Sequence, residues 1–284
     1  MELQLKFSSA LSALVPTNGS KVLVAVSGGV DSMVLLHLMH QSNLDPIVVH
    51  CNFKLRGKES DLDAEFVRQS AENMGLTYHE KSFNTSEFAS DNGISTQMAA
   101  RKLRYEWFEK LADQQGCEFI AVAHHADDSI ETVILNLVKG TGIAGMHGIK
   151  PKFGKIIRPL INMRRAEIIA YADHRRIVWR EDSSNSETHY ERNFVRHEVM
   201  PMLRSLNPNS GEAIANHAIL MQRYEHILEW ITHSVEAKIS RNPHQGRFTI
   251  FNLDLLLEYP EPATLLYHIL RKHGFNYGTC ELAI

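Results

Sequence analysis

The alternation of short apolar runs with amphipathic segments over residues 21–139 is the feature that most limits the fold of this chain. Apolar runs predict strands, and helical spacing of apolar residues predicts helices between them. The predicted strands cover residues 21–26, 46–50, 77–83 and 118–123, and the predicted helices cover residues 31–41, 60–74, 94–115 and 126–139. Strands that are apolar along their whole length are typical of a parallel sheet covered on both faces. With right-handed crossovers, the sequence predicts an α/β fold with a doubly wound parallel sheet.

The pattern changes after about Gly148 and becomes mainly helical. A segment rich in Pro, Gly and Lys comes first, and helices are then predicted over residues 164–176, 190–206, 210–239 and most of 252–274. We therefore expect a catalytic domain over residues 1–208 and a smaller helical domain over residues 209–284. The chain stops abruptly at Ile284, which suits either a C-terminal truncation or a short member of its class.

Composition argues against several classes of protein. Cys51, Cys117 and Cys280 form no CxxC pair, which disfavours a compact zinc or redox site and a disulfide framework. The first 16 residues lack the basic segment of a signal peptide and predict a short amphipathic helix. No apolar run approaches the roughly 18 residues that a membrane-spanning helix needs. We expect a cytoplasmic protein without a membrane partner, and its oligomeric state stays open, with a homodimer as one option.

A glycine-containing loop lies between the first predicted strand and the first predicted helix. It consists of Ser27, Gly28, Gly29, Val30, Asp31 and Ser32. Paired glycines allow a tight turn whose N–H groups approach an anion, and a helix start adds further donors. Asp31 would repel a phosphate, and a Mg²⁺ ion between the two removes this conflict. The alternative is an ordinary glycine turn with Asp31 as a first-turn acid.

This loop resembles the signature of the N-type ATP pyrophosphatases, the PP-loop family. Two further strings resemble one branch of that family, the tRNA(Ile)-lysidine synthetases. Residues 50–61 (HCNFKLRGKESD) are similar to their H-x-N-H-x-L-R…E-S-D block, with Phe53 at a position where His is common. Residues 101–105 (RKLRY) are similar to their R-x-x-R-Y helix.

Two later strings resemble the same branch. Residues 124–132 (HHADDSIET) are similar to its H-H-x-D-D-x-x-E-T block, and residues 182–196 contain its D-x-S-N…R-N-x-[IV]-R block. Together the strings follow the family's order over residues 27–206. Each string is moderately specific, and the ordered set is highly specific.

The resemblance implies a ligase that uses ATP and Mg²⁺ as cofactors. In this reaction ATP activates the C2 oxygen of the cytidine at the wobble position (position 34) of an isoleucine tRNA with a CAU anticodon. The ε-amine of free lysine then attacks C2, so that lysidine, AMP and pyrophosphate are the products. The implied partners are tRNA(Ile) and free lysine.

Polar residues after the second predicted strand are candidates for ATP binding. His50, Asn52 and Arg56 follow this strand beside the phosphate loop, which suits contacts to adenine, ribose or phosphate. The alternative for these residues is a solvated loop.

Carboxylates after the fourth predicted strand are candidates for lysine binding and catalysis. Asp128 and Glu131 are three residues apart and share a helix face. Such a pair can hold an ammonium group, and one member can later accept its proton, because only the neutral amine attacks. The resemblance assigns both to lysine, and His124 is a candidate substrate partner. The alternatives are helix capping by Asp127 and Asp128 and a structural role for His124.

Basic residues indicate where RNA binds. Residues 139–205 contain 13 Lys and Arg against seven Asp and Glu, although the whole chain has a net charge of -3. Such a segment suits the phosphate backbone of a nucleic acid. The expected tRNA-binding residues, all from the family blocks, are Arg101, Arg104, Asn185, Arg192, Asn193 and Arg196. Surface salt bridges are the alternative for the arginines.

Three rival functions remain on sequence grounds. A PP-loop tRNA thiolation enzyme is the first, although its paired or reactive cysteines have no counterpart in the spacing found here. An amide ligase of the GMP or NAD synthetase type is the second, and no glutaminase domain is evident. A catalytically silent tRNA-binding protein is the third, and Asp31, Asp128 and Glu131 argue against it.

Overall fold

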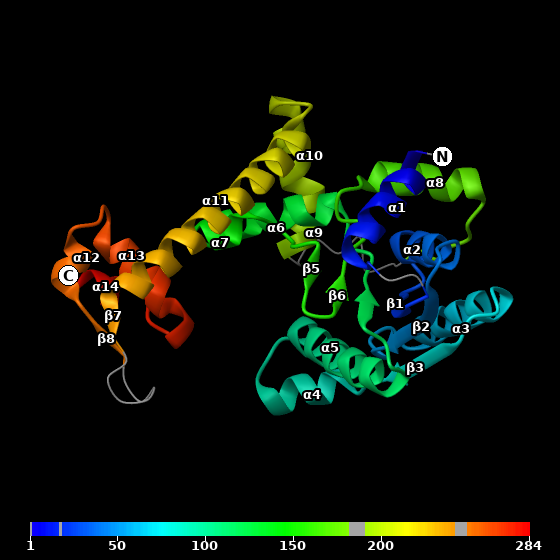
Figure 1. Cartoon of the computed structure of the whole chain (residues 1–284). Coiled ribbons are helices and arrows are strands. Elements are labelled where there is room, and N and C mark those ends of the chain that lie inside the picture. Colours follow the sequence, from blue (N-terminus) through cyan, green and yellow to red (C-terminus); the bar gives the residue numbers. More distant parts are fainter. Residues whose placement is uncertain (1, 17–18, 182–190, 242–248) are drawn as a thin grey trace. The chain divides into compact units, whose positions relative to one another are not determined.

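Six strands form one sheet at the centre of the N-terminal part of the chain (Figure 1). The computed structural model describes residues 2–16, 19–181, 191–241 and 249–284. The strands are β1 (Lys21–Ala25), β2 (Asp45–Asn52), β3 (Tyr78–Ser82), β4 (Phe119–Ala121), β5 (Lys152–Phe153) and β6 (Ile156–Ile157). Their order is β3-β2-β1-β4-β6-β5, and all neighbours are parallel except β5 and β6. The predicted parallel sheet is confirmed.

The order of the strands reverses at β1. The chain proceeds from β1 to β2 and β3 on one side, and then places β4 on the other side of β1. The register pairs Val24 of β1 with Ala121 of β4, so the carboxyl ends of these two strands are adjacent. Ligands of open α/β sheets bind at such a switch point. The loops after β1 and β4 are therefore where a site is expected.

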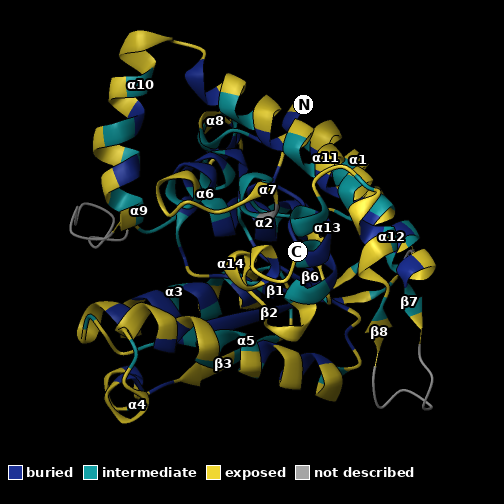
Figure 2. Cartoon of the chain, turned by 90° about the vertical axis from the view of Figure 1, so that its left-hand side faces the viewer, coloured by how far each residue is buried: buried dark blue, intermediate teal, exposed yellow. Residues whose placement is uncertain are grey.

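Helices cover both faces of the sheet because successive strand residues point to opposite sides. Val22 and Val24 of β1 pack into a core with α1, α2, α3 and α8, whereas Leu23 packs into a second core with α5. All three residues are fully buried, and Figure 2 shows the central strands β1 and β2 as largely buried, among helices with exposed outer faces. Burial of each such side chain stabilises the fold by about 1.5–3 kcal/mol. The doubly wound arrangement is thus confirmed.

The helices of this part largely match the predicted ranges. Their bounds are α1 (Glu2–Leu14), α2 (Val30–His40), α3 (Lys58–Asn73), α4 (Thr85–Asn92), α5 (Thr96–Gln115), α6 (Ala126–Val138), α8 (Arg165–Arg175), α9 (Glu191–Phe194) and α10 (Met200–Leu206). The polar helix α4 was not predicted. The single helix expected over residues 190–206 is instead α9, a π-helical segment (Val195–Val199) and α10, with Pro201 in the first turn of α10.

The chain divides into two compact units, of which the first is Met1–Lys139 with Gly148–Ala215. The second is Gly140–His147 with Asn216–Ile284. Its elements are α7 (Ile143–Met146), most of α11 (Ser210–Ile239), β7 (Ser240–Arg241), β8 (Ile250–Phe251), α12 (Leu253–Leu257), α13 (Pro262–Leu270), a 3-10 turn (Arg271–His273) and α14 (Tyr277–Glu281). Compactness does not test independent folding, so the domain boundary at residues 208/209 stays a prediction.

The second unit has its own apolar core. Residues of α11, α12, α13 and α14 form it, including Val235, Leu256 and Ile269. The mainly helical character expected for this region is confirmed. Within the described ranges, no helix has both the length and the apolar character required to cross a bilayer.

Candidate active site at the switch point

The loop after β1 folds around the hydroxyl group of Ser32. The Oγ atom of Ser32 accepts hydrogen bonds from the backbone amides of Ser27 (3.1 Å) and Gly28 (3.2 Å), and donates one to the carbonyl of Gly29 (2.9 Å). Gly28 has a φ of 97°, which a residue with a side chain rarely adopts. Gly29 then starts α2 as its N-cap. The predicted strand, glycine turn and helix start are all present.

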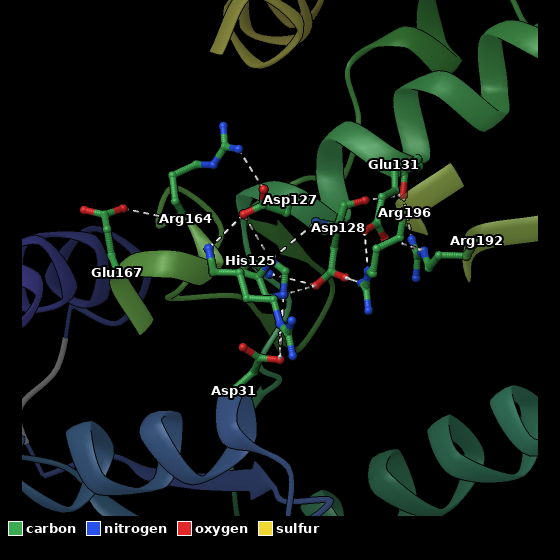
Figure 3. Close-up of polar contacts among 11 residues, drawn as sticks. Asp31, His125, Asp127, Asp128, Glu131, Arg164, Glu167, Arg192 and Arg196 are labelled. Atoms are coloured by element: carbon green, nitrogen blue, oxygen red, sulfur yellow. Dashed lines mark hydrogen bonds and ion pairs between the residues drawn. The ribbon is translucent and has the colours of Figure 1, made fainter. Parts of the chain in front are cut away.

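Asp31 lies in the first turn of α2 and faces the end of β4 (Figure 3). Its Oδ2 atom is 3.7 Å from Nε2 of His125 and 3.8 Å from Nε of Arg165. Its Oδ1 atom is buried and has no hydrogen-bond partner within the described ranges. Burial raises the pKa of Asp31 above its usual value.

A carboxylate oxygen that is buried and lacks a donor fits a cation. Mg²⁺ in nucleotide-using sites takes one or two carboxylates together with phosphate oxygens. The described residues contain no group of three metal-ligating side chains, so an ion held by protein ligands alone does not fit there. Asp31 therefore suits a metal ion that a nucleotide shares.

Of the three candidates expected after the second strand, His50 and Asn52 belong to β2 itself and only Arg56 follows it, and all three side chains bind other groups of the protein. Nδ1 of His50 donates to the carbonyl of Val26 at 2.8 Å, and burial lowers the pKa of His50. The side chain of Asn52 donates to Asp61 at 2.9 Å, and Arg56 donates to Asp63 at 2.8 Å. His50 thus contacts the residue that directly precedes the phosphate loop, and the contact of all three residues with ATP stays a prediction.

The residues after β4 form the cap of α6. The backbone N–H of His125 donates to Oδ2 of Asp128 at 3.0 Å, and Nδ1 of His125 accepts from the amide of Asp128 at 3.4 Å. Capping by Asp128 is therefore observed. Asp127 accepts instead from Nη2 of Arg164 (2.7 Å) and from the amide of Arg165 (2.8 Å), at the start of α8. Asp127 thus joins two helices rather than capping its own.

Asp128 and Glu131 form a cluster with two arginines, Arg192 and Arg196 (Figure 3). Arg196 donates to both carboxylate oxygens of Glu131, at 2.7 and 3.0 Å, and to Oδ1 of Asp128 at 3.2 Å. Arg192 donates to Thr132 at 2.7 Å and lies 3.5 Å from Glu131. Two of the residues predicted for lysine and two of those predicted for tRNA therefore lie together, which no spacing in the sequence indicated.

The environment separates the two carboxylates in acidity. Burial raises the pKa of Glu131, although Arg196 opposes the shift. Burial acts in the same direction on Asp128, but His125, through its charge and its backbone hydrogen bond, outweighs it and holds the pKa of Asp128 below its usual value. Two nearby acids with pKa values moved in opposite directions are typical of a site with distinct proton-accepting and charge-holding roles.

The remaining predicted site residues are His124, Arg101, Arg104, Asn193 and Asn185. Burial lowers the pKa of His124 to about 4, so His124 is neutral at pH 7. On α5, the guanidinium of Arg101 lies 5.0 Å from the ring centre of Tyr105, and that of Arg104 lies 5.1 Å from the ring of Phe53. Asn193 is in α9. Asn185 lies outside the described residues.

Three residues near the site were not singled out by sequence analysis. All three lie close to the candidate residues. His125 follows β4, Arg158 follows β6, and Arg165 is the first residue of α8. His125 is part of the His-His doublet and is the one that a motif could have indicated. Arg158 follows a strand of two residues, which is too short for periodicity to reveal.

Comparison with known proteins identifies several similar chains. Residues 3–203 match the PP-loop domain family. A protein of Porphyromonas gingivalis named tRNA(Ile)-lysidine synthase is 42% identical over 90% of this chain and 55% of its own length. One of the same name from Bacteroides thetaiotaomicron is 41% identical over 90% of this chain and 59% of its own length. The chain thus spans somewhat more than half of these relatives.

A solved structure shares the fold. The U34-tRNA thiolase NcsA of Methanococcus maripaludis, with its [4Fe-4S] cluster, superposes with a TM-score of 0.62 at 23% identity. The match covers 78% of this chain and 79% of that one. At this identity the likeness concerns the fold alone.

Proposed function

The chain belongs to the PP-loop domain family, and from this premise we propose that it ligates free lysine to C2 of the wobble cytidine (position 34) of tRNA(Ile) with a CAU anticodon. The reaction would use ATP and proceed in the cytoplasm. The observation that carries the proposal is the placement of a phosphate loop with Asp31 next to the Asp128–Glu131 pair at one switch point. Relatives named tRNA(Ile)-lysidine synthase support the choice of substrate.

The loop after β1 supplies the nucleotide half of the mechanism. Its backbone and the N-terminus of α2 suit the β- and γ-phosphates of ATP. Asp31 would hold Mg²⁺, which would neutralise charge on the phosphates. The C2 oxygen of the cytidine attacks the α-phosphorus, and pyrophosphate leaves, which gives an adenylated tRNA.

The pair after β4 supplies the amine half. Asp128, with its lowered pKa, stays ionised and holds the ε-ammonium group of lysine. Glu131, with its raised pKa, is the better proton acceptor and frees the amine for attack. The amine attacks C2, and AMP leaves. Neutral His124 is a further contact for the substrate.

The ammonium group competes with Arg196 for these carboxylates. Arg196 is bound to Glu131 and Asp128 through three hydrogen bonds. A guanidinium pairs with a phosphate as well as with a carboxylate. Arg192, Asn193 and Arg196, together with Arg101 and Arg104, are therefore proposed to contact the tRNA, as is Asn185.

Thiolation gains no support from the cysteines. Burial raises the pKa of Cys51 to about 12 and also raises that of Cys117. Sulfur chemistry requires the thiolate, which burial disfavours at both positions.

An incorporation assay tests the proposal. The protein is incubated with ATP, Mg²⁺, radiolabelled lysine and tRNA(Ile) with a CAU anticodon, and label in the RNA is measured. We expect label that depends on ATP, with AMP and pyrophosphate released, and no label in an elongator methionine tRNA with the same anticodon. Release of ADP and orthophosphate, or incorporation of sulfur in place of lysine, would contradict it.

A further inference from the structure

Arg158 is a buried cation at the carboxyl end of β6, beside the site. Only 6% of its surface is exposed. It directly follows Ile157, which pairs with Ala121 of β4, so Arg158 lies at the same edge of the sheet as the residues after β4. An arginine is rarely buried to this extent unless an anion accompanies it.

The protein satisfies this guanidinium only in part. Nη1 donates to the carbonyl of Lys150 at 2.7 Å, and Tyr105 is close enough to influence the pKa of the guanidinium. Nε is buried without a hydrogen-bond partner. In the part of the chain that the structure describes, no carboxylate forms an ion pair with Arg158. A charge and a donor are therefore left for an anion.

A second unsatisfied group lies next to it. His124 follows β4, the neighbour of β6, and its Nδ1 atom is also buried without a partner. The charges of both Arg158 and Asp128 act on His124. Arg101, which lies over the ring of Tyr105, is a further cation whose charge acts on His124. His124 therefore lies between a cationic group, Arg158, and an acidic group, Asp128.

We propose that Arg158 and His124 bind the α-carboxylate of the amino-acid substrate, while Asp128 and Glu131 bind its ε-ammonium group. This inference rests on the proposed function. Free lysine carries both charges, and a guanidinium fork matches a carboxylate in shape and charge. A carboxylate is also a smaller group to admit beside a buried side chain than a ribose-phosphate backbone is. Tyr105 then orients Arg158, which gives the R-x-x-R-Y helix a role in the lysine pocket.

Substrate analogues test the proposal on the unmodified protein. Lysine, lysinamide and 1,5-diaminopentane share the ε-amine but differ in the carboxylate. We expect the KM for lysinamide and for the diamine to exceed that for lysine by about 10–100-fold, the value of one charge-assisted hydrogen bond or two. Equal KM values for lysine and lysinamide would overturn the subsite and leave the ligation itself intact. Absence of any lysine incorporation would instead refute the proposed function.

Substitutions at Arg158 test whether this residue causes the preference for lysine over lysinamide. Arg158→Gln should raise the KM for lysine about 10–100-fold and remove most of the preference over lysinamide, with the KM for ATP unchanged. Arg158→Lys should retain part of the preference, since it keeps the charge without the fork. Arg68→Gln, at a partly exposed arginine on α3 that pairs with Glu65, should behave as the unmodified protein.

Two outcomes with these variants would contradict the proposal. A rise in the KM for tRNA with an unchanged KM for lysine would assign Arg158 to an RNA phosphate. A preference for lysine over lysinamide that survives intact in folded Arg158→Gln would remove Arg158 from the site. If Arg158→Gln does not fold, Arg158→Lys and Tyr105→Phe serve the same comparison, because each leaves the packing of the buried chain largely in place.

Discussion

The ends of β1 and β4 are neighbours in the sheet, but they are built in different ways. After β1, six consecutive residues form the loop, and their hydrogen bonds run mostly within those six. After β4, Asp128 also caps its own helix through His125, but the guanidinium groups that contact Asp128 and Glu131 come from residues more than 60 positions away. The first half of the site is therefore a property of a short sequence, and the second is a property of the whole fold.

The largest effect is expected from a substitution in the loop after β1, which is the part of the site proposed to bind the nucleotide. Asp31→Ala should lower turnover by roughly 10³-fold, since a metal ion contributes several kcal/mol to the stabilisation of charge. Affinity for tRNA, measured by filter binding, should change little, because the residues proposed to contact tRNA lie outside this loop. Equal losses in turnover and in tRNA affinity would show that the two halves are not separable.

The next effect concerns the proton acceptor. Glu131→Gln should lower kcat by about 10²–10³-fold, the usual contribution of a general base. Because burial raises the pKa of Glu131, kcat of the unmodified protein should rise with pH above the range where an ordinary Glu titrates. This rising limb should vanish in Glu131→Gln. A matched control is Glu198→Gln, at an exposed glutamate nearby, and a limb that persists in Glu131→Gln would assign the base elsewhere.

A smaller effect, on the stability of the fold, tests whether the backbone conformation of the loop after β1 sets its requirement for glycine. Gly28→Ala should lower the free energy of unfolding by about 1–3 kcal/mol, since φ is 97° at this position. Gly29→Ala should cost less, because Gly29 has an ordinary φ of -74°. Urea denaturation of both variants gives the comparison. Equal costs would mean that backbone strain does not set the requirement for glycine.

The smallest effect distinguishes the two carboxylates by pH. The folded protein holds the pKa of Asp128 below its usual value, so Asp128 stabilises the fold above that usual pKa, and this contribution is lost as the pH falls through the folded pKa. Asp128→Asn should therefore weaken the acid dependence of unfolding. Glu131→Gln should act in the opposite direction, because its pKa is raised. Urea midpoints measured from neutral to acid pH for both variants test this prediction. Shifts of the same sign in the two variants would contradict the assignment.

The sequence predicted what local patterns encode. The parallel sheet follows from apolar runs, and the phosphate loop follows from a glycine pair between a strand and a helix. The helix α4 escaped prediction because its residues are largely polar and leave only Thr85 and Ala89 buried. The strands β5 and β6 escaped because two residues carry no periodicity.

The arrangement around β4 could not be predicted for a physical reason. The pairing of Arg196 with Glu131 and the bonding of Asp127 to the start of α8 depend on tertiary packing, which brings distant segments together. The motifs singled out most of these residues, and their membership of a functional site stays a prediction. The motifs could not show that an arginine expected to bind tRNA would pair with the two carboxylates expected to bind lysine.

One backbone contact limits how this protein can be shortened. The amide of Arg180 donates to the carbonyl of Gly28 at 3.0 Å, which supports the loop at its left-handed residue. Leu160, Met163 and Ile168 also belong to the same core as β1 and α2. A fragment that ended at Lys139 would contain the SGGVDS string and both carboxylates, yet it would lack this support and part of its core. A minimal nucleotide-binding version of the chain must therefore extend at least to Arg180.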